Sequence, residues 1–209
     1  YFKGIDEILF IPYARPGGMS YDDYTAVSRD AFTQIGIGVK GIHEFDDPAG
    51  AVADAKGIFT GGGNTFLLLK TLYENELIEP LRKAVKSGTP YMGSSAGSNI
   101  TGLTVGTTND MPIVYPPSFN ALQLVPFNIN PHYLDPDPNS RHQGETRETR
   151  INEFMNFNDQ PVIGLREGSW LRVEGAKMEL KGVLSARLFE KNKEPREVAP
   201  GDVSFLLAR

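Results

Sequence analysis

Short apolar runs alternate with amphipathic helical patterns along the first half of the chain, and this alternation restricts it to few folds. The run at 7–14 ends in the turn-forming sequence RPGG, and a helical pattern with acidic residues in its first turn follows from Ser20. A run followed by a helical pattern recurs at 39–55 and at 57–88. Such β-α units build a parallel sheet with helices on its faces. We therefore expect an α/β fold.

The C-terminal part has a different pattern. Residues 121–132 predict a strand, residues 145–157 predict a helix, and residues 161–192 contain consecutive β segments without intervening helices. We expect one domain over residues 1–209, with a mostly parallel sheet whose C-terminal edge is partly antiparallel. The opening YFKGIDEILFIPYA reads as the end of a helix running into a strand, so we also expect that an N-terminal strand is missing.

Composition excludes several classes of function. The chain has no cysteine, which removes disulfides, thiolate metal sites and cysteine nucleophiles. Its three histidines, His43, His132 and His142, lack the spacing of metal ligands, so we expect neither a metal nor a cofactor. The net charge of −5 argues against a nucleic-acid partner. No apolar run approaches the ~20 residues of a membrane span, so we expect no membrane partner.

The segment Gly93-Ser94-Ser95-Ala96-Gly97 fits the pattern Gly-x-Ser-x-Gly after a short apolar run. In a strand-to-helix elbow, the central residue has a strained backbone, and the flanking glycines avoid collisions with neighbouring segments. We expect Ser95, rather than Ser94, to project at the carboxyl edge of the sheet, where ligands bind in α/β folds. The same residues also suit a simple turn that packs a helix against a strand.

Two sets of backbone N–H groups are candidates for stabilising an oxyanion beside Ser95. The N–H of Ala96 follows the serine directly. The glycines of TGGGNTF (60–66) permit a close backbone approach at a second strand end, where Asn64 is expected to cap the next helix. A phosphate-binding turn is the alternative, but no lysine follows in the P-loop position.

A general base for Ser95 has to come from the three histidines. His132, in NINPHY, follows a predicted strand, whereas His43 lies within an alternating strand pattern and His142 lies in a polar loop. The carboxylate that would orient the base is either Asp110 or Glu167. Triads are defined by geometry, so chain order does not decide between them, and both carboxylates also suit ordinary turns.

The blocks GGGNTFLLLK, GSSAGSN, TTNDMPIV, INPHY, GETRETRI and IGLREGSW together resemble peptidase E, the α-aspartyl dipeptidase family. The resemblance implies a flavodoxin-like α/β fold related to class I glutamine amidotransferases. It also implies a cytoplasmic serine exopeptidase that cleaves Asp-X dipeptides. Carried over by motif, Ser95 is the nucleophile, His132 is the general base, and Gly63 and Ala96 supply the oxyanion N–H groups.

For the third catalytic group the resemblance supports both carboxylates, and we expect Glu167 to orient His132 while Asp110 acts on the substrate's amine. Asn64, in the glycine block, is expected to contribute to substrate binding. Recognition of an aspartate side chain requires a guanidinium, for which Arg147 is the first candidate and Arg150 the second. Both arginines would otherwise pair with glutamates on one helix face.

Two departures from the family pattern are expected to matter. Ser94 stands where the family more often has a large residue, which would alter a pocket wall, and the family's opening strand is absent from this chain. The loop 135–144 is expected to border or close the site.

Other functions remain open on the sequence. The same Ser-His groups would serve a cyanophycinase-like hydrolase of β-linked aspartyl peptides, and a ligand-binding module without chemistry would also use glycine loops. The expected partners are small peptides, and the expected state is a monomer or a homodimer.

Overall fold

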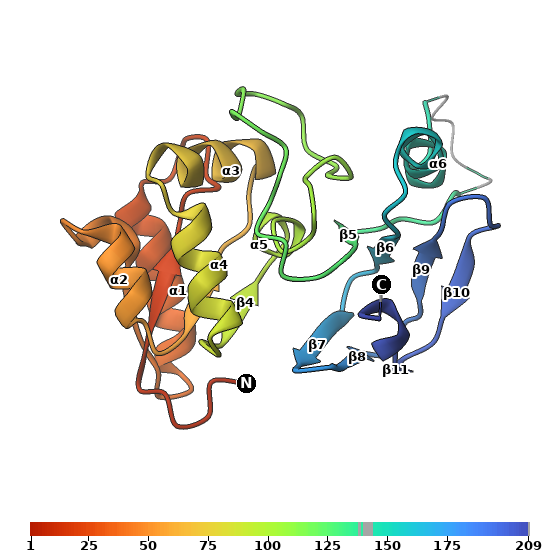
Figure 1. The fold of residues 1–209 in the computed structure, drawn as a ribbon. Helices are drawn as coiled ribbons and strands as arrows, with labels where there is room; N and C mark the ends of the chain where they lie inside the picture. Colours follow the sequence, from red (N-terminus) through yellow and green to blue (C-terminus); the bar gives the residue numbers. More distant parts are fainter. Residues whose placement is uncertain (138, 140–143, 209) are drawn as a thin grey trace. The chain divides into compact units, whose positions relative to one another are not determined.

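The computed structural model describes residues 1–137, 139 and 144–208. These residues form two compact units (Figure 1). The first unit comprises residues 1–105 and 110–124, and the second comprises residues 106–109 and the described residues from Val125 onward. The expectation of one hydrolytic domain over residues 1–209 stays a prediction.

The first unit is built on a parallel sheet of four strands in the order β2-β1-β3-β4. Its strands are β1 (Glu7–Ile11), β2 (Gly38–Gly41), β3 (Ile58–Thr60) and β4 (Tyr91–Gly93). This order is the one found in flavodoxin-like folds, in which ligands bind beyond the carboxyl ends of the strands where the order reverses. The predicted parallel α/β core is confirmed.

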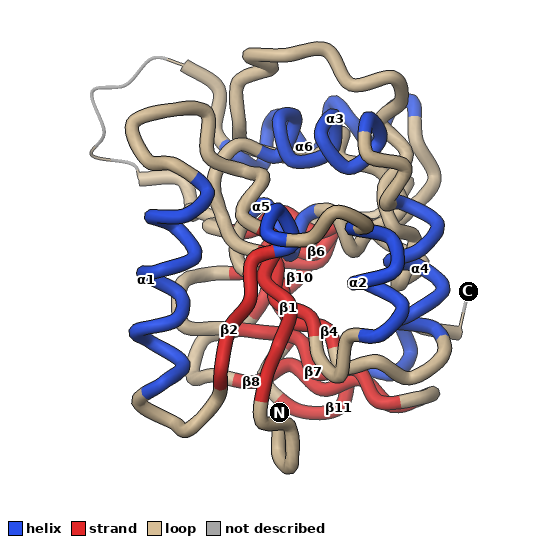
Figure 2. The backbone as a smooth tube through the Cα atoms, turned by 90° about the vertical axis from the view of Figure 1, so that its left-hand side faces the viewer, coloured by secondary structure: helices blue, strands red, loops and turns tan. Residues whose placement is uncertain are grey.

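Helices cover both faces of this sheet. They are α1 (Tyr21–Thr33), α2 (Pro48–Asp54), α3 (Thr65–Glu74), α4 (Ile78–Lys86) and the short α5 (Ala96–Asn99). Successive side chains of β1 point to opposite faces, so Ile8 and Phe10 pack in a cluster with Phe32 of α1. Leu9 and Ile11 belong to the larger cluster with α2, α3 and α4. Figure 2 shows α1 on one side of β1 and β2, and α2 and α4 on the other.

The second unit contains a mixed sheet in the order β10-β9-β6-β5 and an antiparallel sheet in the order β11-β8-β7. Among the strands that the structure describes in this unit, only β5 and β6 pair in parallel, so the predicted partly antiparallel character of the C-terminal part is confirmed. The mixed sheet has β5 (Asn128–Pro131), β6 (Val162–Leu165), β9 (Ala186–Phe189) and β10 (Arg196–Val198). The remaining elements are α6 (Arg147–Phe157), β7 (Trp170–Glu174), β8 (Lys177–Lys181), β11 (Gly201–Asp202) and the 3₁₀ turn η2 (Ser204–Leu206). Among the described helices, none is both long enough and apolar enough to cross a bilayer.

The structure differs from the predicted elements in two places. The strand expected at 39–45 ends at Gly41, because the Glu44 carboxylate accepts the Gly41 N–H at 2.9 Å and closes the 3₁₀ turn η1 (Ile42–Glu44). The strand expected at 121–132 forms only as β5. Residues 121 and 122 instead donate their N–H groups to Leu103 and Ile100, at 3.0 and 2.8 Å, so tertiary pairing overrides the local strand pattern.

The start of α1 gives a stability prediction. Ser20 Oγ accepts the N–H of Asp23 at 3.0 Å, and the Asp23 carboxylate accepts the N–H of Ser20, which is a capping box. We expect Ser20→Ala to lower the free energy of unfolding by about 1 kcal/mol in urea denaturation. Ser87→Ala, at an exposed position just after α4, serves as the matched control. Equal effects of the two substitutions would contradict the capping role.

Candidate active site

Ser95 lies at the tip of a sharp turn between β4 and α5. Its backbone has φ 52° and ψ −109°, a combination outside the ordinary regions for a residue with a side chain. Such strain costs on the order of 1–3 kcal/mol and persists only where the surroundings fix it. Ser95 is half-buried, whereas Ser94 is exposed. The predicted elbow is therefore confirmed, and the nucleophilic role of Ser95 stays a prediction.

The two glycines of the elbow, Gly93 and Gly97, allow a close approach between β4, the start of α5 and the end of β3. A Cβ on Gly93 would lie 2.2 Å from the Gly97 carbonyl oxygen, and a Cβ on Gly97 would lie 2.3 Å from that of Thr60. Side-chain donors fix the turn further, since Ser98 Oγ donates to Gly93 O at 2.7 Å and the Tyr91 hydroxyl donates to Gly97 O at 2.8 Å. Burial raises the pKa of Tyr91, so its hydroxyl keeps the proton that it donates.

The glycine loop after β3 lies against Ser95. A Cβ built on Gly62 would be 3.1 Å from Ser95 Cβ and 3.7 Å from its Oγ. Gly63 has φ 141°, and a Cβ there would lie 2.2 Å from the carbonyl oxygen of Ala14, in the loop after β1. Among the described residues, the N–H groups of Gly63 and Ala96 donate to no other protein atom. Both remain candidate oxyanion donors.

Asn64 and Asp110 together hold the start of α3. Asn64 caps the helix as predicted, because its Oδ1 accepts the N–H of Leu67 at 3.0 Å, while its Nδ2 donates to Met111 O at 2.8 Å. Asp110 Oδ2 accepts the N–H of Thr65 at 2.7 Å. Asp110 thus fastens its own segment to the glycine loop. The roles of Asn64 and Asp110 toward a substrate stay predictions.

His132 and Glu167 meet in the second unit because of the register of β5 and β6. Pro131 is paired with Leu165, so His132 lies one residue beyond its strand and Glu167 two residues beyond the neighbouring one. His132 has φ 56°, and its Nδ1 contacts Glu167 Oε1. A carboxylate at Nδ1 favours the tautomer that leaves Nε2 free to accept a proton. Ser95 belongs to the other unit, and the function of His132 as its base stays a prediction.

The other two histidines have different positions. His43 lies in the 3₁₀ turn rather than in the predicted strand, and its Nε2 is 3.0 Å from Asp22 Oδ1. His142 and its neighbour Arg141 lie outside the described residues, so the expected role of the loop 135–144 stays a prediction. Within the described parts of the chain, no group of three or more histidines, aspartates and glutamates is arranged to hold a metal ion.

Arg147 and Arg150 line one small cavity of about 40 Å³ in the second unit. Asn109 and Asn130 are also among the residues that line this cavity. Arg150 also pairs with Glu145, with Nε 3.5 Å from Oε2, as the helix-face alternative predicts. The Asn130 amide already donates to Thr107 O and to Asn109 Oδ1, so the two arginines are what suits this cavity to a carboxylate.

The sequence profile of peptidase family S51 matches residues 3–181. The chain belongs to this family. Its relatives include "Peptidase E" of Streptomyces coelicolor, with 56% identity over 96% of this chain and 82% of the relative. Another is "Probable alpha-aspartyl dipeptidase" of Drosophila melanogaster, with 50% identity over 98% of this chain and 85% of the relative. The resemblance inferred from the sequence blocks is confirmed.

A solved structure supports the family's fold. The crystal structure of a peptidase from an acI-B1 actinobacterium matches 92% of this chain and 80% of its own, with a TM-score of 0.67 and 19% identity. At that identity the likeness concerns the fold alone. Family S51 membership makes this chain a serine-type peptidase, in agreement with the expectation of an enzyme.

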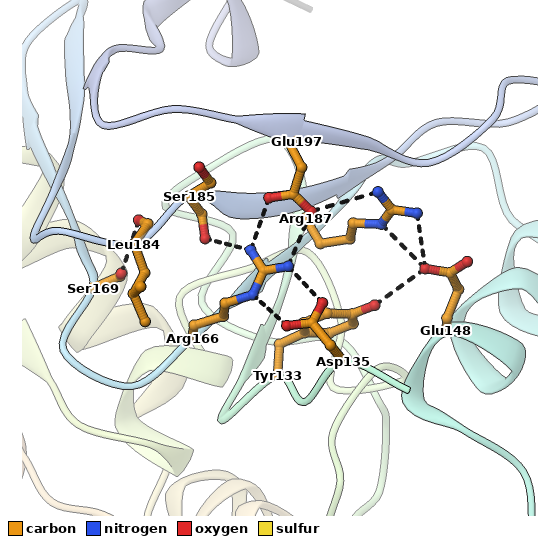
Figure 3. A network of polar contacts seen from close by, with 9 residues as sticks. All are labelled: Tyr133, Asp135, Glu148, Arg166, Ser169, Leu184, Ser185, Arg187 and Glu197. Atoms are coloured by element: carbon orange, nitrogen blue, oxygen red, sulfur yellow. Dashed lines mark hydrogen bonds and ion pairs between the residues drawn. The ribbon is translucent and has the colours of Figure 1, made fainter. Parts of the chain in front are cut away.

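Behind His132 and Glu167, this member of family S51 has a network of charged side chains centred on Arg166 (Figure 3). Arg166 Nε and one terminal nitrogen donate to the two oxygens of Asp135 at 2.8 and 2.6 Å. The terminal nitrogens also donate to the two oxygens of Glu197 at 2.9 and 3.0 Å. Hydrogen bonding to Arg166 lowers the pKa of Asp135, and hydrogen bonding to Asp135 raises that of Arg166.

A second branch of the network reaches α6. The Tyr133 hydroxyl donates to Glu148 Oε2 at 3.2 Å, and Arg187 Nε donates to the same oxygen at 3.1 Å. Arg187 also lies 3.5 Å from Glu197, which joins the two branches. Burial, followed by the nearby charge of Glu148, raises the pKa of Tyr133 to about 12, so its hydroxyl remains a donor.

Sequence reasoning missed the Arg166 network. Its members are charged or aromatic residues that lie between 10 and 39 positions from their partners, and Arg166 is separated from Asp135 by 31. One local signal was available: Arg166 and Tyr133 directly adjoin the predicted site residues Glu167 and His132.

The lowered pKa of Asp135 predicts a pH-dependent contribution to stability. Because its pKa in the folded protein is below the ordinary value of about 3.9, the stabilisation is present above that pH and is lost as the pH falls through the folded pKa. We expect the wild type to exceed Asp135→Asn in free energy of unfolding at pH 7, with the difference shrinking below about pH 4. Urea denaturation at several pH values measures this difference. A gap that widens on acidification would contradict the assignment.

Proposed function

We propose that the protein is a serine dipeptidase that hydrolyses Asp-X dipeptides with an N-terminal aspartate. The observation that carries this proposal is the strained backbone of Ser95 in a glycine-flanked elbow beside the Gly62–Gly63 loop. Strain of this kind aims a serine hydroxyl at a ligand rather than serving the packing of a simple turn. The names of the two relatives supply the substrate class.

In the proposed reaction, His132 removes the proton of the Ser95 hydroxyl as the oxygen attacks the scissile carbonyl. The N–H groups of Gly63 and Ala96 stabilise the resulting oxyanion, and each such donor contributes about 2.7–4 kcal/mol to lowering the barrier. His132 then donates its proton to the leaving amine, and water hydrolyses the aspartyl ester on Ser95. Glu167 holds the imidazole with Nε2 available throughout.

Selection of aspartate is assigned to Arg147. A second arginine lines the same cavity, and guanidinium groups bind a carboxylate by charge-assisted hydrogen bonds. Arg150 shares its charge with Glu145 and is the weaker candidate. Asp110 and Asn64 are proposed to act near the substrate's free amine. A cytoplasmic location and a monomeric or homodimeric state, expected from the sequence, stay proposals as well.

Replacement of the nucleophile tests the reaction. We expect Ser95→Ala to lower kcat for Asp-Leu by at least about 10³-fold, because the residual rate then rests on binding and oxyanion stabilisation alone. Ser94→Ala is the matched control, since Ser94 is exposed beside the elbow and is expected to keep most of the activity. Near-normal turnover by Ser95→Ala would refute the proposed mechanism.

Substitution of Arg147 tests the specificity. A hydrogen bond to a charged group contributes about 1.5–3 kcal/mol, so Arg147→Met should lower kcat/KM for Asp-Leu by about 10- to 100-fold. Arg150→Met should have a smaller effect. Assays with Asp-Leu, Glu-Leu and β-Asp-Leu compare the substrate classes. Preferential cleavage of β-Asp-Leu by the wild type would favour the cyanophycinase-like alternative instead.

A further inference from the structure

We propose that Arg166 is a positioning residue, which holds the turn carrying Glu167 against the loop carrying His132. The inference rests on the proposed function, because it assigns His132 and Glu167 as the general base and its orienting carboxylate. It adds Arg166, a residue that takes no direct part in the proposed chemical steps. In this proposal the hydrogen bonds of the Arg166 guanidinium keep His132 and Glu167 in contact.

The His132–Glu167 contact is too exposed to hold the two side chains together on its own. The side chain of His132 is 51% exposed and that of Glu167 is 74% exposed. Ion pairs in such surroundings contribute about 0–1 kcal/mol, because water competes for both groups and both side chains lose entropy on pairing. A base needs an orienting carboxylate in nearly every molecule, so the two loops require a stronger connection than this contact.

Arg166 supplies that connection. It directly precedes Glu167, and its side chain is only 15% exposed. All five of its N–H groups are used, by the two oxygens of Asp135, the two oxygens of Glu197 and the carbonyl oxygen of Ser185 at 2.6 Å. Paired hydrogen bonds to a carboxylate fix both distance and orientation. The turn after β6 is thereby tied to the loop after β5, to Ser185 just before β9, and to Glu197 of β10.

The histidine side of the contact is fixed by packing. The Tyr133 N–H donates to Leu165 O at 2.9 Å, and Tyr133 is 2% exposed. A Cβ on Gly164 would lie 2.6 Å from Tyr133 Cδ2, so the ring lies directly on the backbone of β6. The guanidinium of Arg166 covers the same ring at 5.5 Å from its centroid. His132 is thus anchored next to Tyr133, while Glu167 depends on Arg166.

Asp135 makes the coupling between the two loops direct. It lies three residues after His132, and its carboxylate binds the arginine that adjoins Glu167. The Arg166–Asp135 pair therefore spans the same two loops as the His132–Glu167 contact, but with two hydrogen bonds and far less exposure of the arginine. Loss of Arg166 is expected to free the Glu167 turn while leaving His132 in place.

The chain offers a matched control in the same unit. Arg172 of β7 pairs with Glu174 at 3.1 Å, and its side chain is 50% exposed. Arg172→Met removes an arginine and an ion pair, as Arg166→Met does, but on a strand that carries no proposed site residue. A general effect of charge or surface stability would appear in both variants.

The first measurement reads the contact itself and needs no activity. In proton NMR, a hydrogen shared between His132 Nδ1 and a carboxylate gives a resonance far downfield, which His132→Gln identifies by removing it. We expect this resonance in the wild type and in Arg172→Met, and its loss in Arg166→Met. Its persistence in folded Arg166→Met would overturn the inference, whatever the substrate of the enzyme proves to be.

The second measurement is steady-state cleavage of Asp-Leu. We expect Arg166→Met to lower kcat by about 10- to 100-fold, the range for a small displacement of a catalytic group, with KM within about twofold of the wild type. Arg172→Met should retain wild-type values. An unchanged kcat, or a loss expressed only in KM, would overturn the inference. Absence of cleavage by the wild type would instead refute the proposed function and leave the NMR result decisive.

Milder variants keep the inference testable if Arg166→Met does not fold, as judged by circular dichroism. Arg166→Lys keeps the charge but cannot reproduce the fork of five donors. Asp135→Asn keeps the arginine and its bonds to Glu197 but weakens the connection to the His132 loop. Both should have a lower kcat and a weaker downfield resonance than the wild type and Arg172→Met. Wild-type behaviour of both would overturn the inference.

Discussion

The candidate site depends on the closeness of α5 to the ends of β3 and β4. Gly97 lies so near the carbonyl oxygen of Thr60 that a single methyl group would not fit between them. The helix starts at this distance, and Ser95, which links it to β4, has the strained conformation. The residue proposed to perform the chemistry is thus joined directly to the sheet that forms the core of the first unit.

In the second unit, too, the ends of neighbouring parallel strands position the candidate site residues. A parallel pair of strands, β5 and β6, ends at a common edge, and the residues one and two positions beyond the strands meet there. The strands alone do not secure that meeting, because both side chains are largely exposed. The charged network behind them, together with the buried ring of Tyr133, supplies the rigidity that the strand ends lack.

Local features and the order of the β-α units were predictable from the sequence, whereas most long-range side-chain contacts were not. The helix after Ser20, the cap at Asn64 and the elbow at Ser95 were predicted because each depends on residues within a few positions of one another. The strand expected through residues 121–127 failed because hydrogen bonds to a distant loop outweigh local propensity. The bond between Asp110 and Thr65, which are 45 residues apart, was not predicted. No spacing rule relates Arg166 to partners some thirty residues away in both directions.

The elbow also indicates where this enzyme can be altered. Gly93 and Gly97 lie against backbone carbonyl groups, and Ala96 is almost fully buried. These three positions therefore have no space for larger side chains. Ser94 differs: its backbone N–H binds Thr60 O at 3.1 Å, but the residue is exposed. A larger side chain at position 94 would therefore extend into solvent and leave the backbone of the elbow unchanged, which makes this position the most tolerant of the five in the motif.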